Sequence, residues 1–290
     1  MAVDHPYLMH GILATSAMHL AYLRPNEVRK YLRLCDQHQV IAIAQFRKRL
    51  GNVDSQNAAA LFALAALLSA AALARMLPRM RTLSPENGGS VVEWILETIT
   101  LTRGARDVLA LGSHWVYESP MRNAVLGFDP PPYALAPTHV RSHIHQLSEF
   151  CIATCTDPIH RATCLEAIQH LRTTYDTVCT LARDQLEIGH LMTWFVKLNP
   201  GFLDLLRAHH STAVLILCDF WVLWGAFRHL WYVQDLAALS LPILEGLLDE
   251  THRPWLDWAK AELSENMPCL KDTGHVSGTM SSLSTPSNYD

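Results

Sequence analysis

Charged side chains are scarce in this sequence of 290 residues. Asp, Glu, Lys and Arg make up 17% of it, and hydrophobic residues reach 50%. An ordinary soluble domain carries roughly 25% charged residues. The net charge is −4, with a pI of about 6.4, whereas a domain that binds nucleic acid often has a clustered basic face and a pI above roughly 9. We therefore predict a large hydrophobic core and no direct binding of nucleic acid by this chain.

The sequence also lacks the cysteine and histidine motifs that commonly bind metal ions. The seven cysteines include no Cys-x-x-Cys pair and no zinc-cluster spacing, and their odd number in apolar helical surroundings indicates buried free thiols in a reducing compartment. The 16 histidines include no His-Glu-x-x-His motif, and Glu187 with His190 is the one Glu-x-x-His pair. A di-metal carboxylate site in a helix bundle needs two such pairs. We predict no metal and no cofactor.

Signatures of several enzyme classes are absent. The sequence has no Gly-x-Ser-x-Gly elbow, no glycine-rich phosphate loop and no dinucleotide fingerprint. It also lacks aspartate-rich clusters that would hold magnesium and a diphosphate. No export signal opens the sequence, so we expect a helix from the start and a protein inside the cell, in the nucleus or cytoplasm. The apolar run 58–74 is short of the roughly 20 residues of a membrane span and is mostly alanine, so we predict a buried helix there.

Helical periodicity runs through most of the sequence. Apolar positions recur at helical spacing from Leu8 onward, and we predict that Asp4 caps the first helix and that Pro25 ends it. Pro78 and Gly112 are predicted to end the third and fourth helices. No strand alternation stands out. Further helices are predicted at about 27–50, 57–77, 91–111, 138–154, 157–181, 186–196, 211–233, 236–248 and 254–263.

The predicted fold class is all-α, as a single irregular multi-helix domain with an apolar cavity. We expect residues 1–263 to form this helical regulatory or ligand-binding-like domain. The proline-rich stretch 127–137 is predicted to be an extended connection that crosses the domain, because apolar helices continue on both sides of it. From about residue 264 Ser, Thr, Gly and Pro prevail, so 264–290 is predicted to be a disordered tail.

Four stretches carry a family likeness, in order along residues 4–260. They are His5-Pro6-Tyr7-Leu8-Met9-His10 with His19-Leu20-Ala21, then Ala58-Ala59-Ala60-Leu61-Phe62-Ala63-Leu64, then Arg103-Gly104-Ala105-Arg106 with Trp115 and Ser119-Pro120-Met121, and finally Trp231-Tyr232 with His252-Arg253-Pro254-Trp255-Leu256-Asp257-Trp258. Together they resemble the C-terminal regulatory domain of fungal zinc-cluster transcription factors, in particular the sterol uptake control type. The resemblance implies an all-helical regulatory domain with an apolar cavity for a sterol-like ligand.

The sequence departs from this family at three points. The zinc cluster is absent, Asp219 stands where the family tends to place a histidine, and Asp235 stands where it tends to place a glycine. A carboxylate in an apolar helix is costly unless it is paired or protonated. Asp219 is therefore predicted to form a salt bridge, for example to Arg228 or Arg207, to lie at an exposed helix edge, or to remain protonated and able to donate a proton.

An aromatic set on one helix and its end has two interpretations. It is either core packing or the wall of a cavity for a polycyclic or isoprenoid ligand. Under the second interpretation, the predicted ligand-binding residues are Trp115, Met192, Trp194, Phe220, Trp221, Trp224, Phe227 and Trp231.

Two functions follow from these observations. The favoured one is a transcription-factor-like regulatory domain that senses an apolar, sterol- or terpenoid-like small molecule, lacks its own DNA-binding module and acts with a protein partner in transcription. The alternative is a stand-alone enzyme of fungal secondary metabolism, an acid-initiated cyclase or isomerase acting on a terpenoid or polyketide. Under that alternative the catalytic acids are Asp219 and Asp235.

Overall fold

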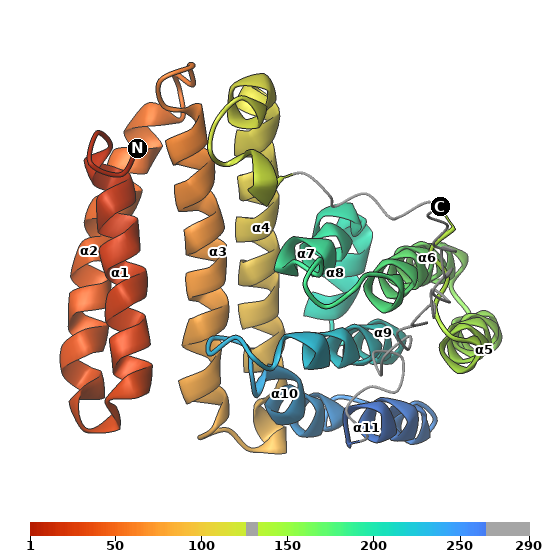
Figure 1. The fold of residues 1–290 in the computed structure, drawn as a ribbon. Helices are drawn as coiled ribbons and strands as arrows, with labels where there is room; N and C mark the ends of the chain where they lie inside the picture. The colour runs from red at the N-terminus through yellow and green to blue at the C-terminus, as the bar shows by residue number, and fades with distance from the viewer. Residues whose placement is uncertain (126–132, 265–290) are drawn as a thin grey trace, which may run out of the picture.

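The computed structural model describes residues 1–125 and 133–264, and these residues form helices and no strand. The all-α prediction is confirmed for this part of the chain. Four long helices stand side by side, and the shorter helices gather on one side of α4 (Figure 1). The long helices are α1 (Pro6–Leu23), α2 (Val28–Arg49), α3 (Ala58–Met80) and α4 (Gly88–Tyr117). The shorter ones are α5 (Thr138–Thr154), α6 (Pro158–Thr180), α7 (Ile188–Lys197), α8 (Pro200–Arg207), α9 (Ser211–Val222), α10 (Leu236–Glu245) and α11 (Leu256–Ser264).

Short 3-10 turns join several of these helices. They are η1 (Pro25–Glu27), η2 (Pro85–Asn87), η3 (Arg122–Ala124), η4 (Leu223–Phe227) and η5 (Arg253–Trp255). Most of the predicted proline-rich connection and nearly all of the predicted tail lie outside the described residues, at 126–132 and 265–290.

The start of α1 differs from the prediction. The helix begins at Pro6, so the capping position falls on His5, whose side chain makes no capping hydrogen bond. Asp4 lies one residue too early to cap, and its carboxylate pairs with the N-terminal amine at 3.1 Å. Proline suits the first turn of a helix, where its missing N–H has no intrahelical acceptor.

Helix α3 continues through Pro78, which was predicted to end it. The neighbouring Leu77 and Met80 are buried, at 5% and 2% exposure, so their packing holds the last turn in place. That packing outweighs the cost of a proline inside a helix, about 3 kcal/mol. The whole helix has 23 residues, and its most apolar stretch has a mean hydropathy of 2.0. The helix is therefore long and apolar enough to cross a membrane, contrary to the prediction from the length of the run 58–74. Because 72% of that stretch is buried inside the protein, α3 has the burial of a core helix.

Gly112 bends α4 without ending it. Its backbone leaves helical geometry, with φ −138° and ψ 29°, and the helix then resumes to Tyr117. A Cβ atom at this position would lie 2.8 Å from the Cβ of Ala58, at the start of α3. The absence of a side chain therefore lets α3 and α4 approach closely here.

The main core surrounds α9. All residues of this helix from Thr212 to Val222 are buried, so the strong hydrophobicity of the segment is used in packing on every side. The helix predicted at 211–233 stops at Val222 and continues as η4. The short helix α8 was not predicted, although Asn199 caps it by accepting from the backbone N–H of Gly201 at 2.8 Å and Pro200 opens it.

Candidate functional site

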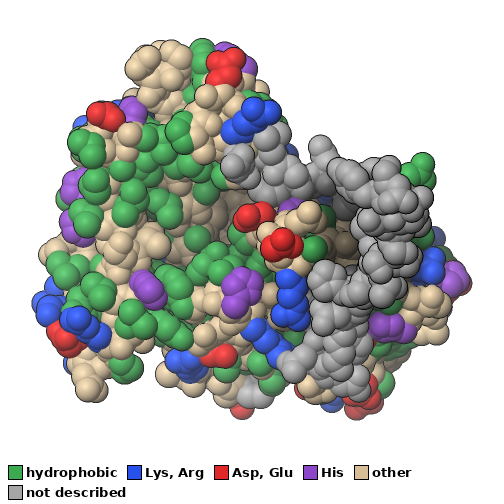
Figure 2. Space-filling model, in the orientation of Figure 1, with side chains coloured by type: hydrophobic (Ala, Val, Ile, Leu, Met, Phe, Trp, Pro, Cys, Tyr) green, Lys and Arg blue, Asp and Glu red, His purple; other side chains and the backbone are tan. Residues whose placement is uncertain are grey.

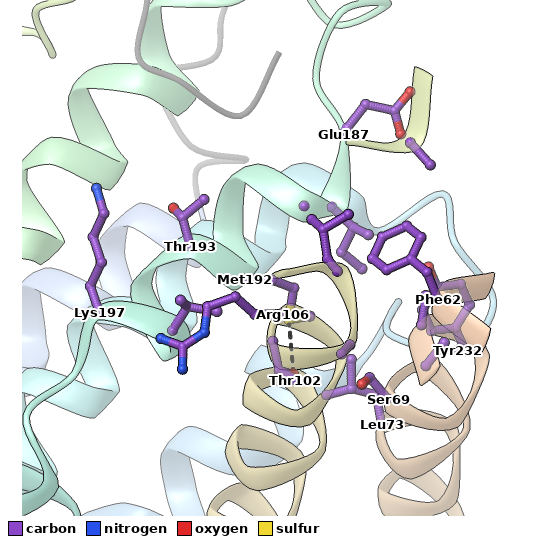
Figure 3. A pocket seen from close by; sticks show the side chains of 18 residues that line it. Phe62, Ser69, Leu73, Thr102, Arg106, Glu187, Met192, Thr193, Lys197 and Tyr232 are labelled. Carbon is purple, nitrogen blue, oxygen red and sulfur yellow. Dashed lines mark hydrogen bonds between the residues drawn. The ribbon is translucent and has the colours of Figure 1, made fainter. Parts of the chain in front are cut away.

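An apolar pocket lies between α3, α4 and α7 (Figure 3). Its volume is about 400 Å³, and ligand sites commonly measure about 300–1,000 Å³. Small residues contribute to it from each helix: Ala66 and Ala70 from α3, Ala105 from α4 and Gly189 from α7. Since these side chains end at Cβ or lack one, they leave unfilled volume where the three helices meet.

Larger apolar side chains and two hydroxyl groups complete the interior. The apolar walls are Phe62, Leu73, Leu109, Ile188, Met192, Val196 and Tyr232. Ser69 donates its hydroxyl proton to the carbonyl of Ala65 at 3.2 Å, and Thr102 donates to the carbonyl of Thr98 at 2.9 Å. With their protons used inside their own helices, both hydroxyls present oxygen lone pairs to a ligand. The interior therefore suits an apolar molecule that carries a hydrogen-bond donor.

Charged side chains lie at the edge of the pocket. Figure 3 shows Lys197, Thr193 and Arg106 toward one end, and Phe62 and Tyr232 toward the other. Arg106 is exposed and pairs with Asp107 at 2.6 Å. On the face drawn in Figure 2, hydrophobic side chains gather over α1 and α3, and the surface is hollowed beside α3.

Arg103 fixes the position of the α7 wall. From α4 its Nε donates to the carbonyl of Phe195 at 3.1 Å, and its Nη2 donates to the carbonyl of Leu198. Burial lowers the pKa of this guanidinium, which is partly shielded from water. This residue belongs to the Arg103-Gly104-Ala105-Arg106 stretch noted in the sequence, so that stretch has a structural role beside the pocket.

The segment between η4 and α10 links the pocket to α1. Tyr232 lines the pocket, and burial raises the pKa of its phenol. The adjacent Trp231 stacks on His19 of α1, with ring centroids 4.7 Å apart. One short segment therefore contacts both the pocket and the N-terminal helix.

Of the predicted ligand-binding residues, Met192 lines this pocket. Five others are brought together in the core and are at most 1% exposed: Trp194, Phe220, Trp221, Trp224 and Phe227. Within this group, Trp194 stacks on Phe220 with centroids 4.2 Å apart. Trp231 lies against α1, and Trp115 packs beside a separate cluster formed by α1, α3 and α4. The structure therefore gives this aromatic set, apart from Met192, the contacts of core packing.

The small residues of the pocket were missed in the sequence. Ala66 and Ala70 belong to the alanine-rich run 58–74, for which the sequence predicted a buried helix and no pocket. The sequence feature that could have identified them as pocket residues is the small size of successive side chains on one face of α3. Sequence spacing does not show whether a facing helix fills the space above such residues, so this signal required the positions of α4 and α7.

Asp219 is fully buried and lies away from the pocket. Its Oδ2 is 2.7 Å from Nε2 of His143, and its backbone carbonyl accepts a hydrogen bond from the hydroxyl of Tyr175 at 2.7 Å. The predicted arginine partners are elsewhere: Arg228 donates to the carbonyl of Leu263, and Arg207 pairs with Asp204. The predictions of an arginine partner and of an exposed helix edge were wrong, because Asp219 is buried and its partner is His143 of α5.

Asp235 has a different environment. Its Oδ2 pairs with Arg81 at 2.8 Å, and its side chain is 44% exposed. This aspartate lies at the N-terminal end of α10 and joins it to the end of α3. This exposed, ion-paired carboxylate lies outside the apolar pocket, so it is poorly placed to donate a proton to a molecule bound there.

Two acid–histidine pairs lie at helix starts, Asp157 with His160 and Glu187 with His190. Asp157 caps α6 by accepting from the backbone N–H groups of Ile159 and His160, each at 2.8 Å. Glu187 donates its backbone N–H to Nδ1 of His190 at 3.0 Å. Within residues 1–125 and 133–264, no group of three or more His, Cys, Asp or Glu residues has an arrangement that would hold a metal ion.

Comparison with known proteins finds a distant relative. No protein-family model matches the chain, and no solved structure matches it either. The chain is 23% identical over 260 residues to a Zn(2)-C6 fungal-type transcription factor of Gibberella zeae (strain ATCC MYA-4620 / CBS 123657 / FGSC 9075 / NRRL 31084 / PH-1). The match covers 87% of this chain and 52% of that protein, so the chain spans about half the length of its relative. The chain is therefore a distant homologue of a fungal zinc-cluster transcription factor, as its sequence motifs predicted.

Proposed function

We propose that this chain is an effector-binding regulatory domain of the fungal zinc-cluster type, and that the pocket between α3, α4 and α7 receives an apolar small molecule. The observation that carries the proposal is an apolar pocket of about 400 Å³ in a chain related to a transcription factor. Such a domain acts inside the cell and, with a protein partner, in the nucleus.

The interior of the pocket supports a sterol- or terpenoid-like ligand. Its walls are aliphatic and aromatic, and the lone pairs of Ser69 and Thr102 can accept a hydrogen bond from a ligand hydroxyl. A rigid polycyclic alcohol meets both requirements, because it buries a large apolar surface and needs few polar partners.

The enzyme alternative draws less support from the geometry. An acid-initiated cyclase needs a carboxylic acid within reach of its apolar substrate. Neither Asp219 nor Asp235 lines the pocket, and Asp235 is exposed and ion-paired. The one carboxylate that lines the pocket, among the described residues, is Glu187.

A direct binding measurement tests the proposal. The purified chain is titrated with dehydroergosterol, a fluorescent sterol, and the increase in its emission gives the affinity. Ala66→Trp adds a large side chain at an exposed position that lines the pocket, so it should lower the affinity at least tenfold without unfolding the chain. Ala72→Trp is the matched control, since Ala72 lies on the same helix but lines a separate, polar pocket with Arg75 and Arg79.

Two outcomes would contradict the proposal. One is the absence of saturable binding by the wild-type chain, and the other is equal binding by wild type and Ala66→Trp. In the organism that encodes the chain, the regulatory role also predicts changed transcript levels of a metabolic pathway on deletion of the gene. Unchanged transcripts together with the loss of a metabolite would favour an enzyme.

A further inference from the structure

The two ends of the apolar pocket differ in charge. Of the described residues that line it, three are charged: Arg106, Glu187 and Lys197. Glu187 directly precedes α7, and Lys197 is the last residue of this helix of 10 residues. The length of α7 therefore separates these two charges by roughly 15 Å. Figure 3 shows Glu187 at one end of the pocket, and Lys197 and Arg106 toward the other. The pocket has an acidic end and a basic end.

A third cation lies at the basic end, behind the wall of the pocket. Arg103 precedes Arg106 by one helical turn on α4, and it donates to the carbonyls of Phe195 and Leu198. Burial, and after it the positive charge of Arg106, lowers the pKa of Arg103, so the two guanidiniums act on each other. Backbone oxygens at the end of a helix repel an anion. Because Arg103 binds two of these oxygens, the end of α7 becomes more favourable for a negative charge.

Nearby carboxylates do not fully balance these cations. Asp107 lies 2.6 Å from Nη2 of Arg106, and Glu166 of α6 accepts a hydrogen bond from Asn199 at 3.1 Å. Neither carboxylate lines the pocket. Lys197 forms no ion pair with any described residue, and arginine keeps its charge at every physiological pH. Three cations therefore lie near two carboxylates at this end, which leaves it positive.

This distribution favours a ligand with one negative group. A carboxylate beside Lys197 and Arg106 gains charge-assisted hydrogen bonds and stays partly hydrated, because both side chains are exposed. Its apolar body then lies between α3, α4 and α7, with the carboxylate of Glu187 at the far end. An ammonium group beside Lys197 is repelled, and a neutral hydroxyl there gains no charge attraction.

We propose that the apolar pocket binds an amphipathic carboxylic acid with a rigid polycyclic body, the chemistry of a terpenoid acid, and that Lys197 and Arg106 hold its carboxylate. The inference rests on the proposed effector-binding function and adds the charge of the effector to it. A neutral polycyclic alcohol uses the same apolar surface but leaves both cations in water.

Three probes that share one tricyclic diterpenoid skeleton test the inference. The purified chain is titrated by calorimetry with dehydroabietic acid, dehydroabietinol and dehydroabietylamine, which differ only in the polar group. We expect the acid to bind about tenfold more tightly than the alcohol, and the amine to bind most weakly. Added salt should weaken binding of the acid and leave that of the alcohol unchanged. Equal or tighter binding of the alcohol or the amine would overturn the inference.

Dehydroergosterol separates this inference from the proposed function. Saturable binding of the sterol or of the diterpenoid alcohol, without a preference for the acid, would leave the pocket as an effector site and overturn the inference alone. No binding of any of the four probes would contradict both. Ala66→Trp should weaken the acid and the alcohol alike, since it fills the apolar interior that both use. Unchanged affinity for the acid in this variant would place the binding outside the pocket.

Charge-reversal variants locate the carboxylate. Lys197→Glu should weaken the acid about tenfold and change the affinity for the alcohol less than about twofold, because Lys197 is exposed at the edge of the pocket. Lys48→Glu is the matched control: Lys48 is an exposed lysine of α2 that does not line the pocket, and the variant changes the net charge by the same amount. Equal effects of the two variants on the acid, or unchanged binding of the acid in Lys197→Glu, would overturn the assignment.

Discussion

Arg103 of α4 holds the carbonyl of Phe195 at 3.1 Å from its Nε, and it also donates to the carbonyl of Leu198. Both carbonyls belong to the end of α7, where backbone oxygens have no intrahelical donor. A positive charge is also favourable at the C-terminal end of a helix dipole. One side chain therefore satisfies the end of α7 and fixes it against α4, and both helices line the apolar pocket.

Replacing Arg103 should destabilise the chain and weaken the pocket. We expect Arg103→Leu to lower the free energy of unfolding by about 1–3 kcal/mol, because partly buried carbonyls lose charge-assisted partners. Urea unfolding followed by circular dichroism measures the change. Arg106→Leu is the control: Arg106 is exposed and pairs only with Asp107 among the described residues, so its loss should cost less than about 1 kcal/mol. Equal losses in the two variants would show that Arg103 does not fix α7.

The pair between His143 and Asp219 should behave as one unit. We expect His143→Leu to cost about 3 kcal/mol or more, since it leaves the Asp219 carboxylate buried without this partner. The double variant His143→Leu with Asp219→Leu should cost clearly less than the sum of the two single variants. A double-mutant cycle by urea unfolding gives the coupling, and strict additivity would contradict a direct interaction.

Asp235 should matter little for stability and binding. Its ion pair with Arg81 is exposed on both sides, at 44% and 53%. Exposed pairs contribute about 0–1 kcal/mol, so we expect Asp235→Asn to change the unfolding free energy by less than about 1 kcal/mol. Dehydroergosterol titration should give the wild-type affinity. A loss of binding in Asp235→Asn would return this residue to the candidate site.

Tyr7 should make the chain less stable at alkaline pH. Burial raises the pKa of its phenol to about 12, although the charge of Arg49 opposes this, and an unfolded tyrosine loses its proton near pH 10. Between these values the folded state binds more protons than the unfolded state, so the unfolding free energy falls as the pH rises. Between pH 10 and 12, we expect the unfolding free energy of Tyr7→Phe to fall by up to about 2–3 kcal/mol less than that of wild type. Parallel pH curves for the two proteins would contradict this assignment.

The sequence by itself determined the helical class and the position of most helices. The predicted helix at 138–154 has the same bounds as α5, which begins directly after Pro137. Local signals gave the wrong helix end where tertiary packing outweighed them, as at Pro78. They also missed the change from α-helical to 3-10 geometry between α9 and η4, because the apolar pattern continues through it. The motifs that resemble fungal zinc-cluster regulators also lie in the sequence itself and lead to the same class of relative.

Tertiary structure alone decided where the sites lie. The aromatic residues of α9 looked suited to a cavity, yet the surrounding helices enclose them as core, while alanines of α3 leave the apolar pocket open. Asp219 and His143 are 76 positions apart, and Asp235 and Arg81 are 154 apart. Periodicity reports which face of a helix is apolar, but not which helix covers that face. The volume of a pocket and the partner of a buried charge therefore depend on long-range packing, which no local pattern in the sequence records.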